Sequence, residues 1–553
     1  MKTKIISLGF CLIAILVGST SCTDFKNDSY GKVISEEYVP KTEADISYVV
    51  NAAYVHWRET MLLWNGVVRS QELCADQDVI PARQGIGWVD GYIYKRWHQH
   101  TWTSEDEGVR EGWSRTYAGI NTCNRILSQI EEGRLEMAAD VKENVVAELK
   151  VLRASYYYIL VDLYGNVPIV TDFKDTSLPT QSTRKQVFDF IIEELNDNID
   201  KLSETPRGYY YGRFNKWVAH TLLAKMYLNA KIWAEKSSWT DCAEELQLCI
   251  DHCDKIIEFA GQSGEYELEV NQKNVFVTRN EGSKEIIFAL PFDNIYVTDW
   301  NAFDFHMYTL APENQVTYKL LHRPWGGVCA IPQFIDSFDP DDTRLETNFI
   351  YGPQYTSLTG REPLMRSDDQ ERQLIYVKEV PSIDQSDVAD GYRWGKFEYE
   401  EGTTNVLSND FPLFRYADIL MMKAEALLRL GHSGAGQLVT KVRERAFRNT
   451  PEKATVTDAD LQKGSVYDYG RRDTDKTSQE GGDDIRFGRF LDELGWEFTQ
   501  EGRRRQDMIR FDVFTKKSWF SHDPSEEYRN LYPIPNSAIL TNSNLKQNPG
   551  YSN

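Results

Sequence analysis

Aromatic and glycine residues alternate in one early segment of the chain, "RQGIGWVDGYIYKRWHQHTW", residues 83–102. Glycine weakens the interior of helices and strands and favours turns, so we expect these rings on loops, where side chains meet solvent and ligands. Planar rings stack on the apolar faces of neutral ligands, and neighbouring Asp, Asn or Arg side chains can bind hydroxyl groups. The segment therefore predicts a ligand-binding surface. The alternative is a loop that folds its rings inward, since any single ring is more typical of a core.

A second set of rings lies in the middle of the chain, within residues 261–409. Apart from the strand-like run "KEIIFALPF", this stretch has no sustained hydrophobic period. A segment of this length without regular structure is typical of a functional excursion or a capping subdomain. We expect it to place a second group of rings on loops, although spacing does not show whether the two groups face each other. The second group comprises Tyr296, Trp300, Phe303, Trp325 and Trp394.

Helical periodicity dominates the rest of the chain. Apolar residues recur at steps of three and four in residues 145–163, 213–233 and 414–432, and small residues allow close contact between helices. Gly165 and Gly431 are expected to end the first and third helices. The pattern predicts a mainly α fold of stacked, tetratricopeptide-like helix pairs without a clean 34-residue period. Irregular insertions with short strands are expected near residues 76–104 and 261–409.

The N-terminus has the pattern of a secretory signal. Lys2 and Lys4 precede the apolar run Ile5–Val17, and small polar residues then lead directly to Cys22. This arrangement favours a lipoprotein signal in residues 1–21, with Cys22 acylated, although the usual leucine three residues earlier is Ser19. Ordinary secretion is the alternative. Residues 22–40 are polar and acidic and are expected to form a tether, and no later run of eighteen apolar residues predicts a membrane span.

Composition excludes several classes of protein. The 553 residues include 62 Lys and Arg against 84 Asp and Glu, a net charge of −22, so nucleic acid is not an expected partner. Apart from Cys11 in the signal and Cys22, six cysteines remain, and six in a chain of this length do not make a disulfide scaffold. Cys242, Cys249 and Cys253 share one helical face near His252, which could hold a metal, but buried packing thiols are the better interpretation. We therefore expect no metal site and no cofactor.

Four sequence blocks resemble the SusD/RagB family of surface lipoproteins. The blocks occur in the family's order and spacing, and together with Cys22 they extend over the whole chain. Residues 41–553 are accordingly interpreted as a single SusD-like domain. The blocks are "AELKVLRASYYYILVDLYGNVPIV" (Ala147–Val170), "FPLFRYADILMMKAEAL" (Phe411–Leu427), "ELGWEFTQEGRRRQDMIRF" (Glu493–Phe511) and "YPIPNSAILTNSNLKQNPGY" (Tyr532–Tyr551).

The resemblance implies a function at the outer membrane of a Gram-negative bacterium. Proteins of this family capture polysaccharide or oligosaccharide at the cell surface and deliver it to a TonB-dependent transporter, and they are not enzymes. Their ligand-binding rings come from an N-terminal loop and from the irregular part, the two places where this sequence concentrates its rings. We therefore predict a glycan site with Trp88, Trp97, Trp300 and Trp325 as stacking platforms and Arg83, Asp90 and Asn301 as polar contacts.

Two alternatives to glycan capture stay open. A glycoside hydrolase needs a pair of carboxyl groups at a set separation, and with 84 Asp and Glu some pair is guaranteed, so their presence decides nothing. The sequence has no nucleophile elbow, zinc-binding H-E-x-x-H or phosphate loop. The other alternative is a transporter lid that binds no glycan of its own.

Two charged blocks are interpreted as structural. In "EGRRRQD", Glu501 stands three to four residues before Arg504 and Arg505, with Glu497 one turn earlier, which predicts ion pairs along a helix. The block "SFDPDDTRLE", residues 337–346, lacks the glycine and the terminal glutamate of a calcium-binding EF-hand loop and predicts an Asp-initiated turn with an Asp–Arg pair. A structural calcium elsewhere stays open.

Overall fold

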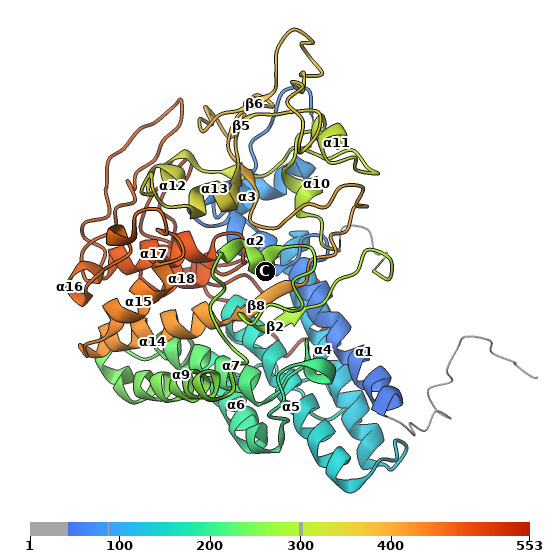
Figure 1. Cartoon of the computed structure of the whole chain (residues 1–553). Coiled ribbons are helices and arrows are strands. Elements are labelled where there is room, and N and C mark those ends of the chain that lie inside the picture. Colours follow the sequence, from blue (N-terminus) through green and yellow to red (C-terminus); the bar gives the residue numbers. More distant parts are fainter. Residues whose placement is uncertain (1–42, 87, 298–301, 553) are drawn as a thin grey trace, which may run out of the picture. The chain divides into compact units, whose positions relative to one another are not determined.

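The computed structural model describes residues 43–86, 88–297 and 302–552, shown in Figure 1. All of them belong to one compact unit, Pro40–Asn553. In these residues the fold is mainly α, as the sequence predicted. Four pairs of helices form its scaffold: α1 (Glu43–Leu62) with α4 (Glu107–Glu131), α5 (Ala139–Leu163) with α6 (Arg184–Asn198), α7 (Lys216–Leu228) with α9 (Ala243–Ser263), and α14 (Tyr416–Leu430) with α15 (Ala435–Arg443).

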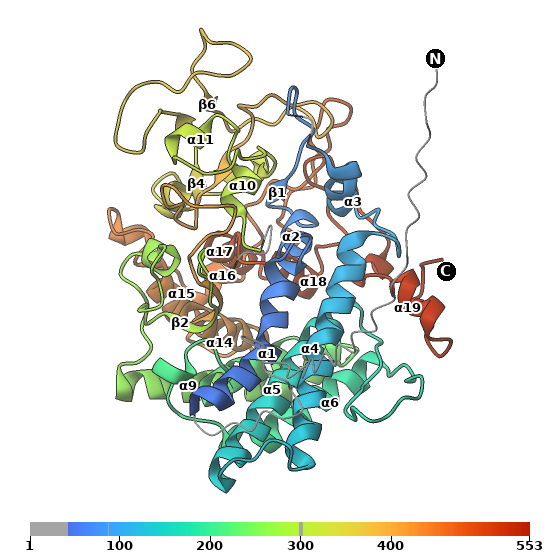
Figure 2. The same ribbon diagram turned by 90° about the vertical axis from the view of Figure 1, so that its right-hand side faces the viewer.

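The pairs pack in chain order, because α4 also contacts α5, and α9 also contacts α14. Figure 2 shows α1, α4, α5 and α6 side by side. The sequence predicted one apolar face for residues 145–163, but α5 is more deeply packed than that, since every residue from Val151 to Leu163 is buried. The helices α4 and α5 pack closely at Gly119 on α4, where a Cβ atom would lie 2.4 Å from the Tyr156 ring. Large rings on α5 therefore require a glycine on the facing helix.

The predicted helix ends are confirmed. The third helix predicted from sequence, α14, ends at Leu430, followed by Gly431 with a φ of 73°. This left-handed conformation suits glycine, which has no Cβ to clash with the backbone. Gly165, two residues after the end of α5, has a φ of 69°.

Short elements fill the irregular parts, and four two-stranded sheets tie them together. The strand predicted in "KEIIFALPF" is present as β2, which pairs antiparallel with β8 beside the scaffold. The strands are β1 (Asp78–Val79), β2 (Ile286–Leu290), β3 (Cys329–Ala330), β4 (Phe349–Ile350), β5 (Gly352–Pro353), β6 (Ile375–Tyr376), β7 (Arg393–Trp394) and β8 (Phe411–Arg415). They pair as β1–β3, β2–β8, β4–β7 and β5–β6.

The remaining helices are mostly short. They are α2 (Val67–Leu73), α3 (Ile93–His98), α8 (Ala230–Trp233), α10 (Phe305–Thr309), α11 (Asn314–Thr317), α12 (Pro332–Asp336), α13 (Arg344–Asn348), α16 (Asp458–Leu461), α17 (Gly488–Phe498), α18 (Arg504–Arg510) and α19 (Asn536–Thr541). None of the helices in the described ranges is long and apolar enough to cross a bilayer.

The β1–β3 pair joins the early loop to the middle excursion. Asp78 lies opposite Ala330 and Val79 opposite Cys329, and an isolated bridge connects Arg83 to Ser386. Residues more than 240 positions apart in the chain are thereby held side by side. Of the two sets of rings that the sequence left unconnected, Trp88 and Trp325 meet beside this sheet. Phe303 and Trp394 of the second set are instead fully buried, and Trp394 lies in β7 rather than on a loop.

The charged block near the C-terminus does not form the local ion pairs predicted from its spacing. The helix is interrupted between α17 and α18, where Gln500 and Gly502 have φ angles of 65° and 75°. Arg504 instead pairs with Asp76 at 2.7 Å, and Arg505 with Asp162 at 3.0 Å. These pairs connect distant segments, so the helical-pair prediction is wrong.

The acidic partners in that block belong to a buried charge network, which we define as Glu285, Lys396, Arg415, Arg445, Glu497 and Glu501. Arg415 donates to Glu285 at 2.7 Å and to Glu497 at 2.8 Å. Burial alone would raise the pKa of Glu497, but the guanidinium groups of Arg445 and Arg415 hold this pKa well below its usual value. The network joins β8 to α17 and to the segment that follows it through ion pairs.

Two smaller predictions are confirmed. Asp342 and Arg344 form a buried ion pair at 2.7 Å in the block interpreted as an Asp-initiated turn, and the Asp339 side chain accepts from the backbone N–H of Asp341. The cysteines at positions 242, 249 and 253 are buried, free thiols. Among the described residues, no group of three or more His, Cys, Asp or Glu side chains is arranged to hold a metal ion.

Candidate ligand-binding site

Three partly exposed tryptophans meet where the early loop and the middle excursion come together. We call Trp64, Trp88 and Trp325 the tryptophan cluster. The ring centroids of Trp88 and Trp325 are 5.4 Å apart, and Trp64 lies 6.4 Å from Trp88 and 5.9 Å from Trp325. None of the three is fully buried. Adjacent flat rings with exposed area can receive a ligand that has an apolar face.

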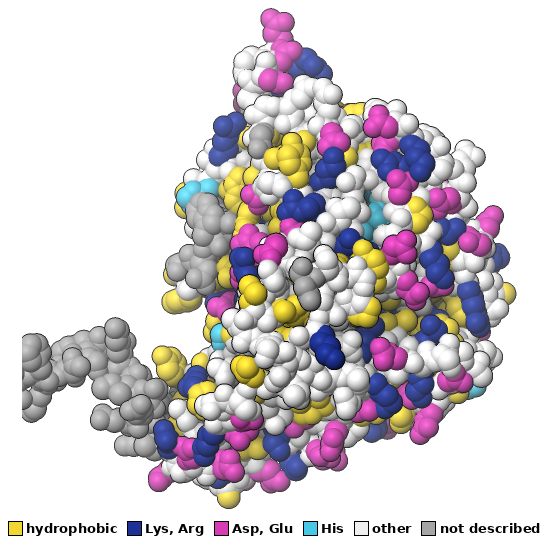
Figure 3. Space-filling model, turned by 180° about the vertical axis from the view of Figure 1, so that it is seen from behind, with side chains coloured by type: hydrophobic (Ala, Val, Ile, Leu, Met, Phe, Trp, Pro, Cys, Tyr) yellow, Lys and Arg dark blue, Asp and Glu magenta, His cyan; other side chains and the backbone are white. Residues whose placement is uncertain are grey.

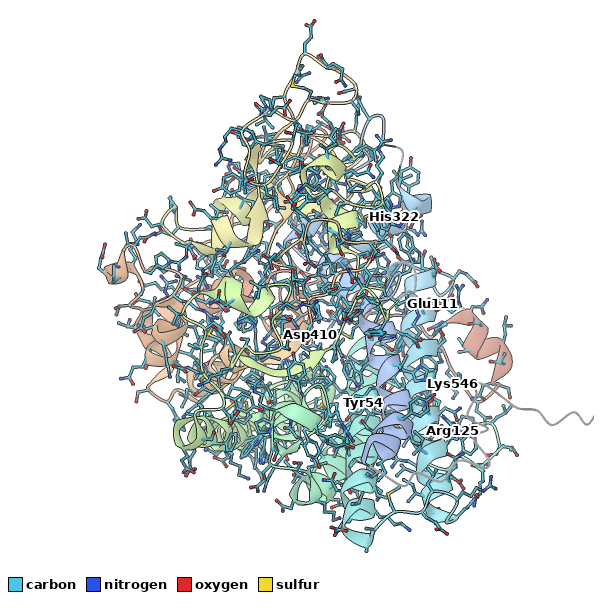
Figure 4. The ribbon with its side chains drawn as sticks, turned by 45° about the vertical axis from the view of Figure 1, so that its right-hand side comes forward. Tyr54, Glu111, Arg125, His322, Asp410 and Lys546 are labelled. Carbon is cyan, nitrogen blue, oxygen red and sulfur yellow. The ribbon has the colours of Figure 1, made fainter. Side chains whose placement is uncertain are left out.

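Three separate segments supply these rings. Trp64 follows the end of α1, Trp88 lies on the loop after β1, and Trp325 lies on the loop that leads into β3. His322, labelled in Figure 4, is on the same loop as Trp325. Because β1 and β3 are paired, the loops after one and before the other lie together.

Backbone contacts fix the Trp325 loop against α10. The N–H of Trp325 donates to the carbonyl of Met307 at 2.8 Å, and the N–H of Gly327 donates to Tyr308 at 3.0 Å. Trp88 packs directly on Gly327, where a Cβ atom would lie 2.0 Å from the indole ring. Any side chain at position 327 would therefore displace Trp88.

Arg83 holds the same loops from inside. Its guanidinium donates to the carbonyls of Asp387 and Asp390 at 2.7 Å each, and to the carbonyl of Gly327 at 3.3 Å. Burial lowers the pKa of Arg83 to about 10, which still leaves it charged at neutral pH. With its N–H groups directed to these carbonyls, Arg83 positions the loops rather than facing a ligand.

Buried rings lie behind the tryptophan cluster. Tyr94 on α3 and Tyr308 on α10 are almost inaccessible, and their centroids lie 5.3 Å and 5.7 Å from that of Trp88. The Tyr94 hydroxyl donates to the carboxylate of Asp90 at 3.1 Å. This places Asp90, which is exposed, beside the rings.

A buried cation lies between two of the rings. The guanidinium carbon of Arg69, on α2, is 4.8 Å from the Trp64 ring centroid and 4.5 Å from that of Tyr308. Arg69 forms an ion pair with Asp304, the residue before α10. Although burial opposes the charge, Asp304 raises the pKa of Arg69 above its ordinary value. The cation therefore holds the Trp64 and Tyr308 rings at a fixed distance from each other.

The predicted site residues lie in different environments in the structure. It brings together Trp88 and Trp325, with Asp90 alongside, whereas Arg83 is an interior positioning residue. Trp300 and Asn301 lie outside the described residues.

Trp97 does not offer an open ring, so that part of the prediction is wrong. It is 2% exposed and packs against Trp102 and Tyr532, with centroids 5.3 Å and 4.8 Å away. The segment Ile93–His98 that carries it is the helix α3 rather than a loop. No glycine interrupts residues 92–98, unlike the stretch before them, so a helix forms here, and Tyr94 and Trp97, three residues apart, both lie on its buried side.

Sequence reasoning missed Trp64, Arg69 and Tyr308. A signal for Trp64 was available, since "WNG" at residues 64–66 repeats the combination of Trp and Asn seen at residues 300–301 and follows directly on a long helix. Arg69 and Tyr308 had no comparable signal, because both act through contacts with residues far away in the chain.

A scaffold of four helix pairs with an irregular part beside it defines a helical-repeat protein of the tetratricopeptide-like kind. Two family models match the chain: one described as "SusD family" over residues 284–551, and one described as "Starch-binding associating with outer membrane" over residues 68–228. Both models describe SusD-type proteins, and they match two long stretches of the chain, which confirms the resemblance to the SusD family found in its sequence.

Individual relatives agree with this assignment. The chain is 24% identical over 446 residues to the starch-binding protein SusD of Bacteroides thetaiotaomicron, covering 73% of this chain and 72% of that protein. It is 22% identical over 573 residues to a SusD-like protein of Formosa agariphila, covering 98% of both. The solved structure of a laminarin-binding SusD-like protein superposes with a TM-score of 0.68 at 20% identity, covering 92% of this chain and all of the other.

Proposed function

We propose that this protein is a glycan-binding lipoprotein of the bacterial outer-membrane surface, anchored through Cys22, which passes oligosaccharides to a TonB-dependent transporter. The observation that carries the proposal is the convergence of three partly exposed tryptophans from three separate segments. One face of a sugar ring is a patch of C–H groups that can cover an indole, while its hydroxyl groups need directed partners. The names of the starch-binding and laminarin-binding relatives support the same ligand class.

The chemistry of the described residues beside the cluster supports binding rather than hydrolysis. Asp304 is buried in its ion pair with Arg69, and Asp90 is exposed and bonded to Tyr94. A hydrolase needs one carboxyl group positioned as an acid and a second as a base or nucleophile around the scissile bond. Incubation of the purified protein with its polysaccharide should therefore release no new reducing ends, and their appearance would favour the enzyme.

The test of the site is a calorimetric titration of the soluble chain, starting after Cys22, against a panel of oligosaccharides. Trp88→Ala and Trp325→Ala should each weaken binding by about 1.5–3 kcal/mol, roughly 10- to 100-fold, since a central aromatic anchor commonly contributes this much. Their melting temperatures should change little, because both rings are partly exposed. Phe173→Ala, which removes an exposed ring elsewhere, is the matched control. Unchanged affinity in both tryptophan variants would rule out this site.

Transfer to a transporter is tested separately. The proposal expects the full-length lipoprotein to co-purify with a TonB-dependent transporter from the outer membrane and glycan uptake to depend on Trp88. Transporter association without binding of any glycan would instead identify a lid.

A further inference from the structure

A second group of aromatic side chains lies on the helical scaffold, apart from the tryptophan cluster. We call Tyr209 and Tyr210, together with the neighbouring Tyr54 and Tyr211, the tyrosine ridge. Tyr209 is 40% exposed, and it lines two clefts, of about 370 Å³ and about 280 Å³. Tyr210 lines the first cleft, and Tyr54 and Tyr211 line the second. A ring thus stands between two hollows, each with further rings in its wall.

The tyrosine ridge is rigid because a buried ion pair supports it. Arg213 donates to both carboxylate oxygens of Glu148, on α5, at 2.8 Å and 2.6 Å. Its guanidinium carbon lies 4.3 Å from the Tyr209 ring centroid and 5.7 Å from that of Tyr210. The two tyrosine rings are themselves 5.0 Å apart and nearly perpendicular. Rings held this way lose little conformational freedom when a ligand covers them.

The other rings of the ridge are held by hydrogen bonds. The Tyr54 hydroxyl donates to Glu148 at 2.6 Å, and the Tyr211 hydroxyl donates to Asp410 at 2.7 Å. Tyr54 and Asp410 are both labelled in Figure 4, in the part of the molecule where α1 approaches β2 and β8. His322, which marks the loop of the tryptophan cluster, lies well apart from them in the same view. The ridge is therefore a separate surface.

Uncharged polar groups line each cleft beside the rings. The first cleft contains Asn144 and Ser203, and the second contains Ser47 and Asn51. Asn144 donates to the carbonyl of Lys201 at 2.9 Å, and Asn51 donates to Ser47 at 3.3 Å. Each amide has a second N–H and a carbonyl oxygen with which to meet a ligand hydroxyl.

Charge argues against an ionic ligand. The Arg213 cation is neutralised by Glu148, and the remaining charged linings are of opposite sign, with Asp140 in one cleft and Arg58 in the other. Figure 3, which shows the molecule from behind, likewise has acidic and basic side chains intermixed over the described residues of that face. A flat ring flanked by amides and hydroxyls, without excess charge, suits a neutral sugar.

We infer that the tyrosine ridge is a second saccharide-binding site, which takes a neutral oligosaccharide with one sugar unit in each cleft and the chain crossing Tyr209. The inference rests on the proposed function, since it assumes that the protein meets glycan chains. Two sites on one rigid body raise the apparent affinity for long chains without any new contact, because the second binding event becomes intramolecular. The apparent affinity for short oligosaccharides, which cannot reach both sites, would not increase.

The experiment is a calorimetric titration of the soluble chain, starting after Cys22. The ligand is the shortest oligosaccharide that binds the wild-type protein and whose binding is weakened by Trp88→Ala. The wild-type protein should bind two oligosaccharides. The tighter of the two sites should be the tryptophan cluster, which Trp88→Ala removes. Tyr209→Ala should bind one ligand, whereas Tyr209→Phe, which keeps the ring over Arg213, should retain both. Tyr209→Ala should also lower the apparent affinity for the long polysaccharide at least several-fold. Melting temperatures of all variants should stay within a few degrees, since Tyr209 is exposed.

The outcomes separate the two hypotheses. A titration of Tyr209→Ala that matches wild type, or complete loss of binding in Trp88→Ala, would overturn the second site and leave the proposed function standing. If Tyr209→Ala binds glycan normally but loses association with a membrane partner, the ridge is a protein interface and the inference is wrong. Failure of wild type to bind any glycan would remove the proposed function and this inference together.

Discussion

The charge network is held together by buried ion pairs, whereas the tryptophan cluster is held together by contacts between partly exposed rings. In the charge network, Arg415 is 1% exposed and its guanidinium donates to three carboxylates from distant segments. In the tryptophan cluster, rings from three segments touch one another while part of each stays open. The network depends on complete burial, whereas the cluster is useful only because burial is incomplete. Substitutions should therefore affect stability in the first region and binding in the second.

The structure also supplies a link between the two regions, the short helix α2. Arg69 on this helix lies between Trp64 and Tyr308, and Glu72, one turn later, accepts from the backbone N–H of Gly502 beside the charge network. Substitutions in the charge network should change stability alone, and substitutions in the tryptophan cluster should change binding alone. Substitutions on α2 should change both.

The largest effect is expected for Arg415→Ala. Removal of this guanidinium leaves Glu285, Glu497 and Glu501 buried with fewer partners, and breaking a buried ion pair from one side costs about 3–5 kcal/mol of unfolding free energy. Chemical denaturation should show a loss at the upper end of this range, with glycan affinity of the folded fraction unchanged. Arg110→Ala, which removes an exposed pair with Glu111, is the matched control and should cost less than about 1 kcal/mol.

If fully folded Arg415→Ala bound glycan more weakly than wild type, the charge network would affect binding as well as stability, and the contrast between the two regions would be wrong. Arg415→Lys keeps one charge in place and should recover part of the stability. If it recovers none, the multiple hydrogen bonds of the guanidinium, rather than its charge, hold the network together.

An intermediate effect is expected for Arg69→Met, which should lower both stability and affinity. The substitution leaves Asp304 buried without its partner and removes the cation between Trp64 and Tyr308. We expect a loss of about 3 kcal/mol in unfolding free energy and of about 1–2 kcal/mol in binding, the latter from the lost cation–π contacts. Denaturation and titration measure the two losses separately.

The double variant Arg69→Met with Asp304→Asn is the control for the unpaired carboxylate. It should regain stability but not affinity, and the tryptophan emission spectrum should differ from wild type because the cation beside Trp64 is gone. Recovery of affinity together with stability would mean that Arg69 acts only as a structural residue.

Local periodicity predicted the scaffold well. Apolar spacing and the glycines at positions 165 and 431 define α5, α7 and α14, because such helices bury a contiguous face whatever surrounds them. The charged block at residues 501–507 was misread for the same reason, since spacing assumes a continuous helix. Gln500 and Gly502 adopt positive φ angles there, and the arginines that follow pair with the distant residues Asp76 and Asp162.

The site was less predictable, because its rings are sorted by contacts over long distances. Trp88 and Trp97 are only nine residues apart and have similar surroundings in sequence. One ring is partly exposed against Gly327, and the other is enclosed by Trp102 and Tyr532. Nothing in residues 83–102 reports on Gly327 or Tyr532, so composition located the segment but not which of its rings are open.

The smallest expected effect is a change in pH dependence from Glu72→Gln. Burial raises the pKa of Glu72 to about 7, from an ordinary value near 4.5, with Glu501 raising it further and Lys396 opposing. The folded protein therefore binds a proton at Glu72 at pH values where the unfolded chain has released it. Linkage then requires the contribution of this group to stability to be complete below about pH 4.5 and to be lost as pH rises through about 7.

Glu72→Gln mimics the protonated carboxyl and keeps an oxygen for the Gly502 N–H. Unfolding free energies measured from pH 5 to 8 should therefore fall with pH more steeply in wild type than in the variant, with the two converging at the acidic end. Asp78 also has a raised pKa, first from burial and then from the Glu72 carboxylate, so Glu72→Gln removes part of that rise and flattens the pH dependence of the variant further. Parallel curves for wild type and variant would show that Glu72 stays ionised in the folded state, and that α2 joins the two regions by packing alone.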